Sequence, residues 1–182
     1  PLVDAQGAAV GWWQLRQHAM YLSGLWSISL MALVMLLALR LPLLDRVMGG
    51  MDQVYRLHKW TGIAAALTAI AHWGAKESSG FAKDLGEWAF YLLLAMVALT
   101  LLARLLPYKH WRLLHRAMPV LFLALVLHAV ALMPLTFWAL PLGLLMGALL
   151  ALGSLAAVWS LAGWVGRSRN HAARIQAVTV LG

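Results

Sequence analysis

The chain has 182 residues, of which 63% are hydrophobic and only 11% are charged. Soluble domains are nearer ~45–50% apolar and ~25% charged, so an ordinary globular enzyme, a nucleic-acid-binding domain and a disordered tail are excluded. The formal charge is +8, and the lack of cysteine excludes disulfides, zinc–sulfur sites and iron–sulfur clusters. Seven histidines are left as good ligands for a transition metal. The composition indicates a multi-pass membrane protein surrounded by lipid.

Five stretches are apolar enough to cross a bilayer as helices, which takes roughly 20 residues each. In chain order they cover about 12–40, 54–74, 87–106, 111–132 and 136–165. The second is shorter and less purely apolar than the others. The last is longer than a perpendicular helix needs, so it is either tilted or begins in the interface, because Pro134 and Pro141 both break helices. The expected fold class is an all-α membrane protein, a bundle of five transmembrane helices.

The basic residues set the expected orientation, because connections that stay in the cytoplasm are enriched in Lys and Arg. Eleven of the 14 lie within 40–59, 104–116 and the tail after 166, whereas Arg16, Lys76 and Lys83 lie on the other side. We therefore expect an external N-terminus and a cytoplasmic C-terminus. In the expected cytoplasmic tail, 166–182, the segment RIQAVTVLG alternates polar and apolar residues like the first β-strand of a further soluble domain. We interpret the chain as a piece of a longer protein.

Four histidines fall within the second and fourth expected spans, and an ionisable group inside a membrane is a functional site by default. His58 and His72 are 14 residues apart, roughly 21 Å along a helix, and differ by only about 40° in direction. His115 and His128 are 13 residues apart, or roughly 20 Å. In parallel helices, His58 and His115 would form an inner couple and His72 and His128 an outer couple. Each couple is able to bind a haem iron from both faces, so we expect two stacked haems.

The fourth span is not expected to be a regular helix. Thirteen steps turn His128 about 140° away from His115. Pro119 removes one helical hydrogen bond and permits a kink between them. Phe122, also between these histidines, is placed in the gap between the two haems, although an aromatic residue in a span often faces lipid. Small residues in 62–69 of the second span let either a flat macrocycle or another helix approach closely.

The segments YRLHKWTGIAAALTAIAHW and HWRLLHRAMPVLFLALVLHAV resemble the ferric-reductase-like transmembrane domain, the family of NADPH oxidases and membrane ferric reductases. The resemblance covers roughly residues 20–165, which places the domain at 1–165, and GGMDQVYRLHKWTG is similar to bacterial members. It implies two b-type haems, the inner one bound by His58 and His115 and the outer one by His72 and His128. It also implies that Phe122 is the aromatic residue between the haems.

The same resemblance implies an activity and its partners. In the family, electrons pass from NAD(P)H through FAD to the inner haem, the outer haem and an external acceptor such as ferric iron or oxygen. The chain would then be the haem-containing part of a membrane oxidoreductase, incomplete without a cytoplasmic flavin/NAD(P)H dehydrogenase domain. The expected location is the bacterial inner membrane.

Two departures from the family concern the acceptor. The oxygen-reducing oxidases place an arginine near the outer haem on the preceding helix. The outer half of the first span is expected to read WSISLMALVM, which contains no arginine. Lys76 stands where those oxidases have a histidine. Both departures favour a metal or another small acceptor over oxygen.

Lys59, Arg112 and Arg116 are expected to form a basic rim that pairs with inner-haem propionates and attracts an anionic flavin, or to act as topology signals alone. Two other functions remain open. One is the haem subunit of a quinol or periplasmic reductase system. The other is a haem-free transporter that relays protons, which predicts carboxylates at mid-depth. None of the six acidic residues lies in the middle of an expected span.

Overall fold

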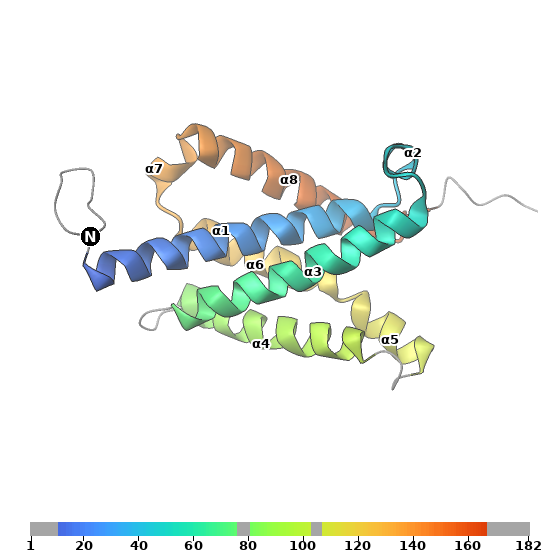
Figure 1. Cartoon of the computed structure of the whole chain (residues 1–182), viewed down its shortest axis with the longest axis horizontal. Helices are drawn as coiled ribbons and strands as arrows, with labels where there is room; N and C mark the ends of the chain where they lie inside the picture. Colours follow the sequence, from blue (N-terminus) through green and yellow to red (C-terminus); the bar gives the residue numbers. More distant parts are fainter. Residues whose placement is uncertain (1–10, 76–80, 103–106, 167–182) are drawn as a thin grey trace, which may run out of the picture.

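A computed structural model describes residues 11–75, 81–102 and 107–166 of the chain. Within these residues all regular structure is α-helical (Figure 1). The helices are α1 (Trp12–Ala38), α2 (Pro42–Met48), α3 (Met51–Gly74), α4 (Phe81–Leu101), α5 (Tyr108–His115), α6 (Met118–Leu132), α7 (Leu135–Trp138) and α8 (Pro141–Leu161). The tail segment RIQAVTVLG and Lys76 lie outside the described residues.

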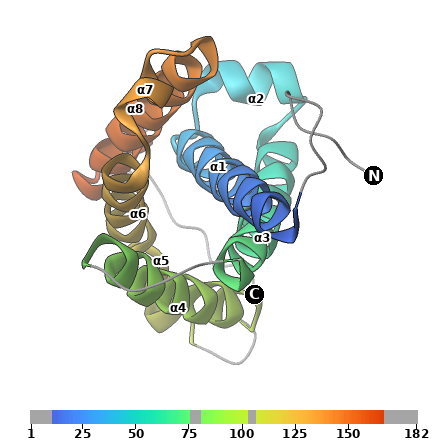
Figure 2. The ribbon, with the colours of Figure 1, turned by 90° about the vertical axis from the view of Figure 1, so that its left-hand side faces the viewer.

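The long helices run lengthwise through the molecule, and Figure 2 shows them nearly end-on. Helix α1 packs against α3 and α8, and α6 packs against α4 and α8. The short helices α2 and α5 lie at one end of the bundle, and α7 lies at the other (Figure 1). We call the end with α2 and α5 the basic end, because these helices carry Arg46, Lys109 and Arg112.

Four helical segments in the described part of the chain are long and apolar enough to cross a membrane: Trp12–Ala38, Ala82–Leu101, Tyr108–Leu132 and Pro141–Leu161. These correspond to four of the five predicted spans. The remaining predicted span, 54–74, is helical as part of α3 but is not among the four. Its sequence explains why, since Asp52, Arg56 and Lys59 interrupt the first half of α3.

The helix boundaries show how proline and glycine divide the chain. Pro141 is the first residue of α8, so the predicted span 136–165 is split into the separate helices α7 and α8. Helix α2 was not predicted. It begins at Pro42 and ends at Gly49, whose φ of +78° is a left-handed conformation that glycine adopts without steric cost.

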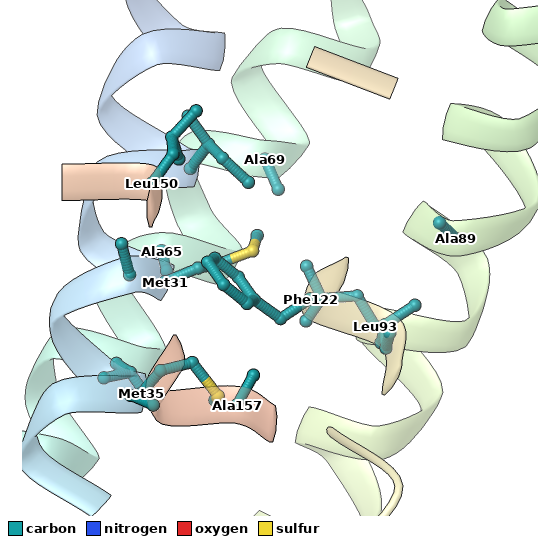
Figure 3. Packing of buried hydrophobic residues seen from close by; sticks show 14 of the residues in the cluster. Met31, Met35, Ala65, Ala69, Ala89, Leu93, Phe122, Leu150 and Ala157 are labelled. Carbon is teal, nitrogen blue, oxygen red and sulfur yellow. The ribbon is translucent and has the colours of Figure 1, made fainter. Parts of the chain in front are cut away.

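The core of the bundle lies where α1, α6 and α8 meet. Ala32 of α1 and Phe122 of α6 are almost completely buried. Figure 3 shows the Phe122 side chain extending from α6 toward Met31 of α1. A Cβ on Gly153 of α8 would lie 2.9 Å from the Ala32 Cβ and 3.0 Å from the Phe122 Cζ. Gly153 therefore sets how closely α8 approaches the other two helices.

Replacing Gly153 with valine is expected to lower the free energy of unfolding by about 1–3 kcal/mol, because the core has no room for added atoms. Thermal unfolding in detergent would measure the loss. The matched control is Gly147→Val on the same helix, where the nearest atom to a new Cβ is the Trp138 Cε3 at 3.8 Å. Equal losses in the two variants would contradict the assignment of Gly153 to the helix contact.

Candidate functional site

The structure brings the four predicted histidines together as two facing couples. In the inner couple the ring centres of His58 and His115 are 6.1 Å apart, with ring planes at 66°. In the outer couple those of His72 and His128 are 6.3 Å apart, with planes at 80°. The first histidine of each segment pairs with the first of the other, and the second with the second. Helices α3 and α6 therefore run in the same direction, as the sequence predicted.

In the described part of the chain, the two ligand-bearing helices α3 and α6 are not among the closely packed helix pairs. Among the helix pairs in close contact in the described structure, α3 is matched with α1, α2 and α4, and α6 with α1, α4 and α8. The histidine rings therefore meet between helices that are not closely packed, α3 with α5 at the inner couple and α3 with α6 at the outer couple. Such an arrangement suits a flat group held by one ring on each side.

The predicted irregularity between His115 and His128 is present. Helix α5 ends at His115, Arg116 and Ala117 form a turn, and α6 begins at Met118. Pro119 has no N–H to donate to the carbonyl of His115, so the helix cannot continue unbroken through this point. This interruption rewinds the chain and lets both histidines face α3.

Three of the four rings are held by backbone carbonyls of a neighbouring helix. His58 Nδ1 lies 3.2 Å from the carbonyl oxygen of Val34, and His72 Nδ1 lies 2.8 Å from that of Met20, both on α1. His128 Nδ1 lies 2.7 Å from the carbonyl oxygen of Ala82 on α4. A carbonyl only accepts, so each Nδ1 carries the proton and donates it, which leaves the lone pair on Nε2.

His115 is held differently. Its Nδ1 is buried and has no hydrogen-bond partner among the described residues. The ring instead stacks on the indole of Trp111, one helical turn before it, with ring centres 5.2 Å apart and planes at 13°. Trp111 was not predicted, although its position four residues before a ligand on one helix is a signal that the sequence offers.

A cavity of about 520 Å³ opens beside the inner couple, within the size range of cofactor pockets. His58 and His115 line it, together with apolar side chains and two cations, Arg40 and Lys59. Of the three residues of the predicted basic rim, Lys59 lines this cavity, whereas Arg112 and Arg116 lie exposed on and just after α5 and do not line it. The role of the rim stays a prediction.

Arg40 is a second site residue that sequence reasoning missed. It lies two residues after the end of α1 and has a φ of +54°, a left-handed conformation that costs a non-glycine residue about 1–2 kcal/mol. This turn places Arg40 on the lining of the cavity rather than along the helix. No sequence pattern signals an arginine in this conformation.

The small residues of α3 lie in the helix packing and on the inner cavity. Ala65 and Ala69 are buried in the helix packing, and the Ser27 hydroxyl of α1 donates a hydrogen bond of 3.0 Å to the Ala65 carbonyl. Gly62 and Ala65 line the inner cavity. Phe122 also lines this cavity, and it is 2% exposed.

One expectation about depth is wrong. The segment WSISLMALVM, residues 26–35, is not the outer half of the first span, because Val34 contacts the inner histidine. The outer part of α1 is the turn around Met20, which contacts His72, and Arg16 lies one turn beyond it. The absence of arginine from the outer half of this helix therefore does not hold as a departure from the family.

The two couples fit the axial ligation of a planar metal macrocycle. A metal–imidazole bond is about 2 Å long and a ring nitrogen lies about 1 Å from its ring centre, so two imidazoles on opposite sides of one metal have centres roughly 6 Å apart. The described residues include no group of three or more His, Cys, Asp or Glu that could hold a metal ion. Two ligands suffice for a haem, because the porphyrin supplies the others.

These features define a class: a helical membrane bundle in which histidines from two parallel helices meet at two depths. The chain belongs to the family of the ferric reductase like transmembrane component, whose model matches residues 23–126. The match includes three of the four histidines and Phe122, and His128 lies two residues beyond it. A search of the curated proteins finds no match. Family membership suggests transmembrane electron transfer by a membrane oxidoreductase.

Proposed function

We propose that the chain moves electrons across the membrane through two b-type haems, one held by His58 and His115 and the other by His72 and His128. The observation that carries the proposal is the spacing of the ring centres, 6.1 Å and 6.3 Å in the two couples. This is the spacing of two imidazoles that share one metal. Haem iron, when bound, supplies a centre that changes between the ferric and ferrous states.

The residues of the chain would bind and orient these groups. The carbonyls that accept from Nδ1 fix the ring of each anchored histidine and increase the basicity of its Nε2. Apolar side chains make up most of the lining of the inner cavity and would pack against the haem ring. Arg40 and Lys59 supply positive charge for the propionate carboxylates that a b-type haem carries.

Electron transfer needs a haem at each of two depths, because apolar side chains cannot carry an electron across the ~30 Å hydrocarbon core. We propose α3 as the fifth span, since it supplies one ligand to each couple and packs along α1, which is long enough to cross. The two histidines of α3 lie roughly 21 Å apart along the helix, so two haems at these positions would divide the crossing into shorter steps. Phe122, buried in the core, is proposed as the aromatic residue between the haems.

The direction of transfer follows from the proposed orientation. The basic end, with α2 and α5, would face the cytoplasm. A flavin/NAD(P)H domain on this side would donate electrons, and a small external acceptor such as ferric iron or oxygen would receive them. The proposed location is the bacterial inner membrane.

An optical spectrum of the detergent-purified chain tests the proposal. We expect a b-type spectrum on reduction with dithionite and a ratio of two haems per chain.

Vesicles that contain the chain and a trapped ferric chelate should then oxidise external dithionite, whereas vesicles with the same chelate but without the chain should not. A colourless protein would contradict the proposal and favour the proton-relay transporter. Reoxidation by oxygen and by ferric chelates, compared side by side, would distinguish the acceptors.

A further inference from the structure

Two glycines lie against the rings of the outer couple. A Cβ on Gly24 of α1 would lie 2.9 Å from both Cε1 and Nδ1 of His72. A Cβ on Gly86 of α4 would overlap Cε1 and Nδ1 of His128 and lie 2.9 Å from its Nε2. Such contacts are shorter than packed carbon atoms tolerate, so neither position accepts a side chain while the ring stays in place.

Both glycines stand in the same relation to the carbonyl that holds the ring. Met20, the acceptor for His72, is four residues before Gly24, and Ala82, the acceptor for His128, is four residues before Gly86. A helical side chain leans toward the N-terminus and covers the preceding turn. A side chain at position 24 or 86 would therefore cover the carbonyl that each histidine uses. Glycine leaves the second lone pair of that oxygen open to the ring N–H.

The inner couple offers a comparison in which this arrangement is missing. The carbonyl of Val34 accepts from His58, and four residues later the chain has Ala38 rather than glycine. This hydrogen bond is 3.2 Å long, compared with 2.8 Å for His72 and 2.7 Å for His128. The two shortest of these bonds are thus the two with a glycine four residues after the acceptor.

We infer that Gly24 and Gly86 are positioning residues for the outer haem, each opening one helical turn so that a ligand ring seats on the helix backbone. This inference rests on the proposed role of His72 and His128 as axial ligands. The seated ring has one fixed tautomer and one direction for its Nε2. The open turns that hold the two rings belong to different helices, α1 for His72 and α4 for His128.

Alanine at Gly86 or Gly24 is the direct test in the chain of 182 residues. Loss of a partner that orients a metal ligand typically lowers metal affinity by about 10–100-fold, so we expect the outer haem to be lost to an acceptor apoprotein about tenfold faster or more. The electron paramagnetic resonance signal of the outer ferric haem should change, and that of the inner haem should not. Haem retention and signals identical to those of the unmodified chain in both variants would overturn the inference.

Gly74 of α3 and Gly147 of α8 provide matched controls. A Cβ on Gly74 would meet nothing within 4 Å, and the nearest atom to one on Gly147 would be the Trp138 Cε3 at 3.8 Å. Gly74→Ala and Gly147→Ala should therefore retain both haems with unchanged signals. Loss of the outer haem in these variants would show that any alanine in the helices has this effect, and would overturn the inference.

A double-variant cycle separates this inference from the proposed function. If Gly86 acts only by making room for the ring, the chain with both Gly86→Ala and His128→Ala should unfold at the same temperature as His128→Ala or higher. A lower temperature for the double variant would show that Gly86 serves helix packing instead. This comparison can be made even if the unmodified chain proves colourless, a result that would contradict the haem proposal alone.

Discussion

Replacing His128 with alanine is expected to reduce the haem content from two per chain to one. The ring of His128 faces His72 across 6.3 Å, and the described residues place no third metal-ligating group beside them. Removal of one ring leaves the outer site with a single axial ligand, while the inner couple keeps both. The pyridine haemochromogen assay on purified protein measures the ratio of haem to chain. Electron transfer to a trapped ferric chelate should fall to the level of vesicles that lack the chain.

The other three histidines make the prediction specific. His72→Ala should remove the same haem as His128→Ala, so that their spectra match, whereas His58→Ala and His115→Ala should leave the outer signal. The matched control is His110→Ala, because His110 is exposed on the same helix as His115. Four variants with both haems present would mean that the facing rings are not ligands. Equal losses in His110→Ala would point to a general folding defect.

The helix packing gives these substitutions a second consequence. Each couple takes one ligand from α3, which packs on α1, and one from α5 or α6, which pack on α4. A group bound at either couple would therefore add a further link between these helix pairs, besides the direct packing of α3 on α4 and of α6 on α1. Since binding to the folded state alone stabilises it, the haem-loaded chain should unfold at a higher temperature than the haem-free chain.

Spacing along a single helix accounts for the features of the site that the sequence predicted correctly. Fourteen steps between His58 and His72 preserve a helix face, and thirteen steps with Pro119 between the other two histidines require the interruption that the structure shows at Arg116 and Ala117. Such arguments use one helix at a time. The parallel arrangement was set by the requirement that both couples meet at matching depths.

The features that the sequence did not predict depend on contacts between segments far apart in the chain. Gly24 and Gly86 look like ordinary small residues of a membrane helix until the rings of another helix are placed on them. The basic rim was expected at Lys59, Arg112 and Arg116, and of these only Lys59 lines the cavity, because the fold of α5 leaves Arg112 exposed away from it. Arg40 reaches the cavity through a left-handed turn that arginine rarely adopts, so composition and periodicity carry no trace of it.

The cavity cations lead to the second large expected effect, which concerns the inner haem alone. The double variant Arg40→Gly with Lys59→Gln is expected to lose the inner haem about tenfold faster, the equivalent of ~1.4 kcal/mol. This lies between the ~0.2–1 kcal/mol of an exposed ion pair and the ~1.5–3 kcal/mol of a hydrogen bond to a charged group. Transfer of haem to an acceptor apoprotein, followed optically, measures the rate.

Charge and folding can be separated in this test. The matched control is Arg112→Gln with Arg116→Gln. It also removes two positive charges from the basic end, but these side chains do not line the cavity. Glycine suits the φ of +54° at position 40, so the first double variant is not expected to unfold at a lower temperature. Equal haem loss in the two double variants would mean that net charge at this end of the bundle, rather than contact at the cavity, holds the inner haem.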